Sequence, residues 1–202
     1  SNADTPSQAL IDPGNSLGGF DLRWRCPTGW GCAVYGQVIG EDEAGALPSK
    51  YLGLGGAEMW SSDGRQRYFA EYSNSFCRGL PGEKRIPGCA YGNVSYAQGY
   101  THTNRWLGAS QGSDSRLLTL GWLDSANGQS LRLHTGQVGR AIGNRVPGAA
   151  YSGSGSLRSV QWQRHWKWGD AIVTPELSYT RLQTPGPSFK EWRAGATVAW
   201  AL

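Results

Sequence analysis

The chain has 202 residues, a formal net charge of +4 and 17% charged residues, with 30 glycines, 10 tryptophans and 9 tyrosines. Glycine and aromatic residues at this density disfavour a soluble helical protein, and no apolar run reaches the ~18 residues of a membrane helix. The positive charge comes mostly from arginines spread along the chain, which favours acidic polysaccharide or lipopolysaccharide as a partner and disfavours nucleic acid.

The N-terminal residues show no strand pattern. Ser1-Asn2-Ala3 has the form of a scar left by tag cleavage, and residues 4–17 show no periodicity. We therefore expect residues 1–17 to be a disordered tail and residues 18–202 to form one antiparallel β domain.

The four cysteines lie in two close pairs, Cys26 with Cys32 and Cys77 with Cys89. Each pair brackets a loop with proline and glycine, so an exported chain would form two local disulfides, although sequence alone allows three connectivities. A zinc site is the alternative, but the spacings of six and twelve residues and the absence of a nearby histidine argue against it. We expect no metal.

Alternation of apolar and polar residues predicts the strands that follow. They are expected at 18–26, 32–40, 51–61, 65–74, 91–103, 104–110, 115–124, 129–138, 156–168, 170–183 and 189–202. Ser125-Ala126-Asn127-Gly128 predicts a hairpin turn, and Trp168-Gly169-Asp170 a tight reversal. The glycine-rich stretch 139–155 predicts a long loop.

An acidic run, Glu41-Asp42-Glu43, follows a predicted strand. Because paired carboxylates catalyse glycoside hydrolysis, this reaction has to be considered. Successive side chains on a strand alternate in direction, so three adjacent acids cannot converge on one sugar. We expect a structural acidic corner and no catalytic residue. The three histidines are scattered, so neither a metal nor another cofactor is expected.

The segment around residue 100 is the candidate binding site. Aromatic rings stack on sugar faces, while amide and guanidinium groups bond hydroxyls or uronates. The candidate polysaccharide-binding residues are Tyr96, Tyr100, His102, Arg105, Trp106 and Arg116. An aromatic belt at a membrane interface would use the same kinds of residue, and the sequence leaves this alternative open.

The last strand has the clearest two-sided pattern. Aromatic residues at both ends of an apolar ladder are typical of a lipid-facing strand. One side carries Trp192, Ala194, Ala196, Val198, Trp200 and Leu202. We favour an antiparallel up-and-down β-barrel of outer-membrane type, complete or partial, over the edge of a soluble β-sandwich, which the same alternation would allow.

Several strands resemble, in order and spacing, those of a known family. The matching stretches are 35–43, which ends in Glu41-Asp42-Glu43, then 68–73, 91–96, 99–102, 106–108 and 114–121. Together, over residues 20–124, they resemble the Wzi capsule assembly family. The rest of the chain agrees with that family in strand pattern only.

The resemblance implies a barrel in the bacterial outer membrane that binds capsular polysaccharide as a lectin, aids capsule assembly or attachment, and is not an enzyme. It also implies contact with outer-membrane lipid. Members of the family are longer, so the chain resembles their C-terminal part. It could close a smaller barrel, associate with a second copy, or be a fragment with open edges.

Two other functions stay open on the sequence. A soluble exported carbohydrate-binding or structural β domain would remain monomeric without detergent. An outer-membrane enzyme acting on lipid or glycan would need a convergent catalytic pair, for which the sequence gives no basis.

Overall fold

The computed structural model describes residues 17–27, 29, 31–44, 47–78, 90, 101–102, 105–106, 112–139, 154–186 and 188–200. Every regular element in these ranges is a β-strand, which confirms the predicted all-β antiparallel class. Within the same ranges, no helix is long and apolar enough to cross a membrane.

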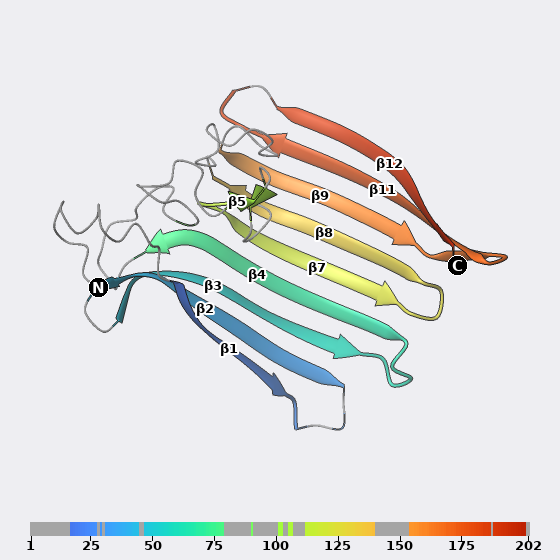
Figure 1. Cartoon of the computed structure of the whole chain (residues 1–202), viewed down its shortest axis with the longest axis horizontal. Helices are drawn as coiled ribbons and strands as arrows, with labels where there is room; N and C mark the ends of the chain where they lie inside the picture. The colour runs from blue at the N-terminus through green and yellow to red at the C-terminus, as the bar shows by residue number, and fades with distance from the viewer. Residues whose placement is uncertain are drawn as a thin grey trace.

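Ten strands form one antiparallel sheet, and two short strands form a separate hairpin (Figure 1). The strands of the sheet are β1 (Leu17–Arg25), β2 (Cys32–Ala44), β3 (Leu47–Trp60), β4 (Gln66–Arg78), β7 (Arg116–Asp124), β8 (Gln129–Val138), β9 (Gly155–Arg164), β10 (Trp166–Trp168), β11 (Ala171–Gln183) and β12 (Phe189–Trp200). The hairpin consists of β5 (Thr101–His102) and β6 (Arg105–Trp106). Neighbours follow chain order from β1 to β4 and on through β7, β8, β9 and β11, and β12 pairs with β11.

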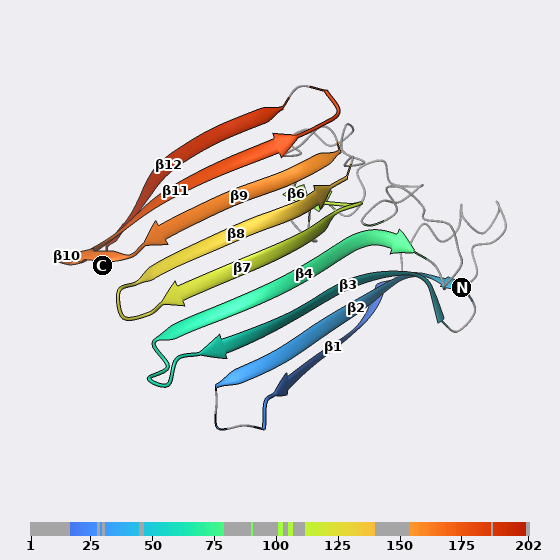
Figure 2. The same cartoon turned by 180° about the vertical axis from the view of Figure 1, so that it is seen from behind.

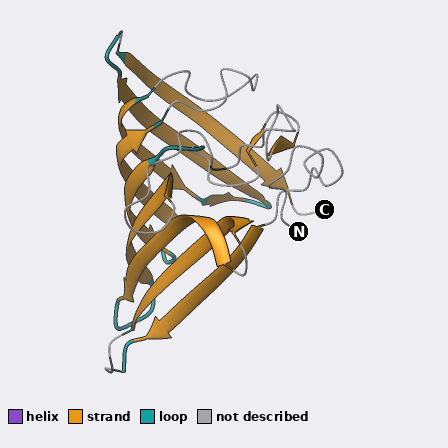
Figure 3. Ribbon diagram, turned by 90° about the vertical axis from the view of Figure 1, so that its left-hand side faces the viewer, coloured by secondary structure: helices purple, strands orange, loops and turns teal. Residues whose placement is uncertain are grey.

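The sheet is a single layer that curves into a trough with a convex and a concave face (Figure 3). Its outermost strands, β1 and β12, do not pair with each other in the described part of the chain, so the sheet is open. Short turns join β1 to β2, β3 to β4 and β7 to β8 at one end (Figures 1 and 2). We call the opposite end, where β4 connects to β7 and β8 to β9, the long-connection end.

The predicted hairpin at residues 125–128 is confirmed, and its geometry follows from its side chains. The Asp124 carboxylate accepts hydrogen bonds from the backbone N–H groups of Ala126 at 3.0 Å and Asn127 at 3.2 Å. Gly128 has a φ of 61°, which a residue without a side chain adopts at no steric cost.

Three strands are longer than predicted. β2 continues to Ala44, β3 begins at Leu47 and β4 ends at Arg78. The additional residues of β2 are mostly acidic and poor strand formers, yet they pair with β3 as far as Ala44 opposite Leu47. Pairing with a neighbouring strand therefore outweighs local propensity here.

The predicted strand 156–168 is divided in the structure into β9 and β10. The break lies at His165, although its backbone N–H donates to the carbonyl oxygen of Gly128 at 2.7 Å and so continues the β8–β9 register. The ladder with β11 is interrupted between Gln163 and Trp166, where the register places Pro175, which has no N–H to donate, opposite β9. The prediction of one uninterrupted strand was wrong at this point.

Some predictions fall largely outside the described residues. The tail is one, although Leu17 already belongs to β1. Of the two predicted strands at 91–103 and 104–110, the structure describes only β5 and β6.

Two clusters of buried apolar residues lie on the concave face near the long-connection end. Leu117, Val138, Leu157 and Leu182 form one cluster, each at most 5% exposed. Ala90 packs on Leu52. The long connection between β4 and β7 therefore contacts the concave face at Ala90.

Candidate functional site

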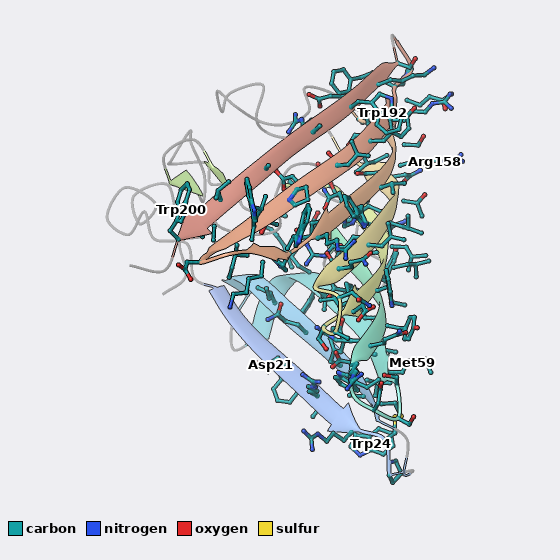
Figure 4. All side chains as sticks on the ribbon, turned by 90° about the vertical axis from the view of Figure 1, so that its right-hand side faces the viewer. Asp21, Trp24, Met59, Arg158, Trp192 and Trp200 are labelled. Atoms are coloured by element: carbon teal, nitrogen blue, oxygen red, sulfur yellow. A yellow bond between two sulfur atoms is a disulfide. The ribbon has the colours of Figure 1, made fainter. Side chains whose placement is uncertain are left out.

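The convex face carries an apolar belt that crosses all the long strands of the sheet. Cross-strand register places on this face large apolar side chains that are between 38% and 77% exposed. They are Phe20, Leu22, Trp24, Val34, Val38, Met59, Tyr68, Tyr72, Leu118, Leu120, Leu133, Val160, Trp166, Trp168, Leu177, Trp192, Val198 and Trp200. Figure 4 shows Trp24, Met59 and Trp192 on the convex side and Asp21 on the concave side.

This convex face suits hydrocarbon rather than water. A continuous apolar surface over nine neighbouring long strands far exceeds the patches that monomeric soluble proteins expose. The ladder on β12 from Trp192 to Trp200 extends about 27 Å along the strand. With the ~40° tilt usual for barrels, it would cover about 20 Å of an apolar band ~25 Å high.

The concave face is polar, because the residues between the apolar ones point to it. On β8, β9, β11 and β12 one register row consists of Arg132, Gln161, Ser178 and Arg193. The next row consists of Ser130, Gln163, Glu176 and Gly195. These two rows line a groove of about 590 Å³.

The groove carries charged groups of both signs at its edge. Arg193 forms an ion pair with Glu191 at 2.9 Å, and its side chain is 74% exposed. Gly195 carries no side chain, and a Cβ there would come within 3.0 Å of a carboxylate oxygen of Glu176. The groove therefore offers guanidinium and amide groups to a ligand along its length.

A third polar row borders this groove. The Thr119 hydroxyl lies 3.0 Å from His134 Nδ1, and the Ser159 and Thr180 hydroxyls lie 3.2 Å apart. These hydrogen bonds join β7 to β8 and β9 to β11 across the concave face. They fix the relative positions of the side chains that border the groove.

In the other half of the concave face, a buried carboxylate on β3 links β1 and β4 through two ion pairs, an arrangement that we call the clamp. Glu58 on β3, whose side chain is 1% exposed, forms ion pairs with Arg23 on β1 and Arg67 on β4. Arg67 Nε donates to Glu58 Oε2 at 2.7 Å. Arg23 thus reaches across β2, where Ala33 is buried. Beside the clamp, the Tyr35 hydroxyl donates to Glu71 at 3.1 Å.

We expect the substitution Glu58→Gln to lower the free energy of unfolding by about 2 kcal/mol. Removing one member of a buried ion pair typically costs more, but both guanidiniums are about half exposed and can be solvated. Urea unfolding in lipid vesicles, followed by tryptophan fluorescence, measures the change. Glu191→Gln, at an exposed ion pair, should cost less than about 1 kcal/mol; equal losses in the two variants would contradict a clamping role for Glu58.

Of the residues predicted for saccharide binding, the structure brings three together in one hairpin and places a fourth, Arg116, in the sheet. His102 pairs with Arg105, and Trp106 with Thr101, so the chain reverses between them. Arg116 begins β7 on the convex side, where its Nε lies 3.5 Å from Asn74 Oδ1 and its guanidinium 4.3 Å from the Phe76 ring. Tyr96 and Tyr100 lie outside the described residues.

The groove residues were not singled out from the sequence. Arg132, Gln161 and Arg193 each belong to the polar side of an alternating strand, which is a local signal. Their arrangement in one row depends on the register of four strands, which alternation does not provide.

The acidic corner lies inside a strand. Glu41, Asp42 and Glu43 belong to β2, with Glu41 opposite Lys50 and Glu43 opposite Pro48. Their role as a structural corner stays a prediction.

One predicted disulfide is present. Cys26 and Cys32 are bonded and close the turn between β1 and β2. Cys77 lies in β4, but Cys89 is outside the described residues, so that pairing stays a prediction. Among the described residues, no group of three or more His, Cys, Asp or Glu side chains could hold a metal ion.

Comparison with known proteins gives a family match. The model of the family described as capsule assembly protein Wzi matches residues 2–185. A relative from Klebsiella pneumoniae, described as an uncharacterized 55.8 kDa protein in the cps region, is 49% identical over 57 residues, which are 26% of this chain and 11% of the relative.

A solved structure has a similar fold. It is described as Wzi, an outer membrane protein involved in group 1 capsule assembly in Escherichia coli and a carbohydrate binding β-barrel. The TM-score is 0.73 at 24% identity, and the alignment covers 98% of this chain and 45% of that chain. The open sheet therefore matches less than half of a longer barrel chain.

Proposed function

The chain belongs to the capsule assembly protein Wzi family, and on that basis we propose that it forms part of an outer-membrane β-barrel that binds capsular or other acidic surface polysaccharide. The concave groove is the proposed binding surface. The protein acts at the bacterial cell surface as a lectin that aids capsule assembly or attachment, and it catalyses no reaction.

The observation that carries the proposal is the division of one sheet into an apolar convex face and a polar concave face with a groove that contains two arginines. An apolar outer face and a polar interior are the defining features of outer-membrane barrels. Because the groove of Arg132, Gln161 and Arg193 lies on the polar face, a polymer inside the barrel would have direct access to it.

The groove suits a polymer with repeated acidic sugars. Arg132 on β8 and Arg193 on β12 are separated by three strand spacings, about 14 Å, so they would contact different sugars of one polymer. Guanidinium groups bind carboxylates with two hydrogen bonds, and the glutamine amides between them can bind hydroxyls. Weak contacts repeated along a polymer add up to useful affinity.

The hairpin of β5 and β6 is a second proposed contact. It carries His102, Arg105 and Trp106 and belongs to the same connection between β4 and β7 as Ala90, which packs on the concave face. Tyr96 and Tyr100 precede it in the chain. We keep these five residues as proposed saccharide contacts.

Binding to an immobilised acidic capsular polysaccharide, by the full chain in detergent micelles, tests the proposal. Raising the ionic strength from about 0.1 M to about 1 M shortens the Debye length from about 10 Å to 3 Å, and we expect the affinity to fall several-fold. A neutral glucan serves as the control. Equal binding to both polymers, or affinity that does not change with salt, would contradict recognition by arginine.

A further inference from the structure

Three cations stand side by side on the convex face at its long-connection end. Arg158 on β9 lies opposite Arg181 on β11, which lies opposite Lys190 on β12. We call these residues the cationic row. All three side chains are exposed, and Figure 4 shows Arg158 projecting from the convex side.

The cationic row borders the apolar belt directly. Two residues along each strand, the next register row consists of Val160, Tyr179 and Trp192. The rings of Tyr179 and Trp192 are 4.7 Å apart, as expected for an aromatic girdle at a membrane interface. The cations therefore lie at the level where lipid headgroups meet acyl chains.

Without a bound anion, the neighbouring positive charges of the cationic row repel one another and destabilise the folded sheet. Directly opposed residues on antiparallel strands have Cα atoms about 5 Å apart, and like charges in such pairs are destabilising. In the described part of the chain, no carboxylate forms an ion pair with Arg158, Arg181 or Lys190. The adjacent Glu191 points to the concave face, where it pairs with Arg193.

We propose that the cationic row binds the phosphate groups of a lipid A-type glycolipid, a phosphorylated and multiply acylated disaccharide, in the outer leaflet. Two arginines and a lysine match phosphate oxygens in charge and hydrogen bonding, and the adjoining apolar belt takes the acyl chains. Long connections of outer-membrane barrels face outward, which places the row in the outer leaflet. This inference rests on the proposed outer-membrane location, but not on polysaccharide binding by the groove.

The first test needs no variant. The full chain is reconstituted in phosphatidylcholine nanodiscs that contain bisphosphorylated lipid A or the same lipid with its phosphates removed, and native mass spectrometry counts the lipid A retained after extraction. We expect at least about ten-fold stronger retention of the phosphorylated lipid, in line with phosphate-dependent contacts by three cations. Equal retention of both lipids would overturn the proposal.

The second test uses a matched pair of variants. The triple change Arg158→Gln, Arg181→Gln and Lys190→Gln should abolish the preference for phosphorylated lipid A. Arg164→Gln removes a convex-side cation from the opposite end of β9 and should keep the preference. If the triple variant keeps the preference, or if both variants lose it, the assignment to the cationic row is wrong.

Polysaccharide binding by the same variants separates the two proposals. The triple variant should bind the acidic polymer as the unchanged protein does, because the row and the groove lie on opposite faces. Polymer binding without any phosphate preference would refute the lipid site alone. Phosphate preference without polymer binding would refute the groove alone, and failure to enter nanodiscs would refute both.

Discussion

Replacing Ala196 with arginine is expected to lower the free energy of unfolding in lipid by about 2–4 kcal/mol. Ala196 lies on the convex face of β12 opposite Pro175, midway between the aromatic residues Trp192 and Trp200. A guanidinium there would face hydrocarbon near the middle of the apolar ladder. Unfolding by urea in phosphatidylcholine vesicles, followed by tryptophan fluorescence, measures the loss.

Thr197→Arg is the matched control, because Thr197 is the adjacent residue and faces the polar concave side. We expect this change to cost less than about 1 kcal/mol, as surface substitutions away from buried groups do. A similar cost for the two arginines would mean that the convex face does not meet lipid. The choice between a membrane barrel and a soluble sandwich would then have to be reversed.

The double substitution Arg132→Gln and Arg193→Gln should weaken binding of an acidic polysaccharide at least ten-fold. A hydrogen bond to a charged group contributes about 1.5–3 kcal/mol, and about 1.4 kcal/mol corresponds to a factor of ten. Both arginines are exposed to solvent, so we expect the lower end of the range for the pair. Titration with a defined oligosaccharide of the acidic polymer measures the change in Kd.

Two further variants test the charge of the groove against its shape. Glu176→Gln removes a carboxylate from the same groove and should leave binding of an acidic polymer unchanged or slightly tighter. Arg132→Lys combined with Arg193→Lys should keep the salt dependence but lose affinity, because lysine cannot form the two-pronged contact. Weaker binding by Glu176→Gln would indicate that the groove recognises neutral hydroxyls instead.

Much of the fold could be predicted because the relevant signals are local. Successive side chains on a strand point to opposite faces, so alternation alone assigned Trp192 and Val198 to one side and Arg193 to the other. The turn at Gly128 and the bond between Cys26 and Cys32 likewise involve residues close in the chain. Predicted strand ends were less accurate where pairing extended a strand, as at Ala44, and the break at His165 was not predicted.

The candidate sites depended on contacts between distant parts of the chain. Arg132 and Arg193 share a groove, Arg23 and Arg67 share Glu58, and Arg158 stands beside Arg181, because strands pair in one particular register. A shift of a single residue would exchange the two faces of a strand. The sequence by itself therefore determined the strands, their two-sided character and the local turns, whereas only the tertiary structure decided which polar residues meet, because register and curvature are properties of the whole sheet.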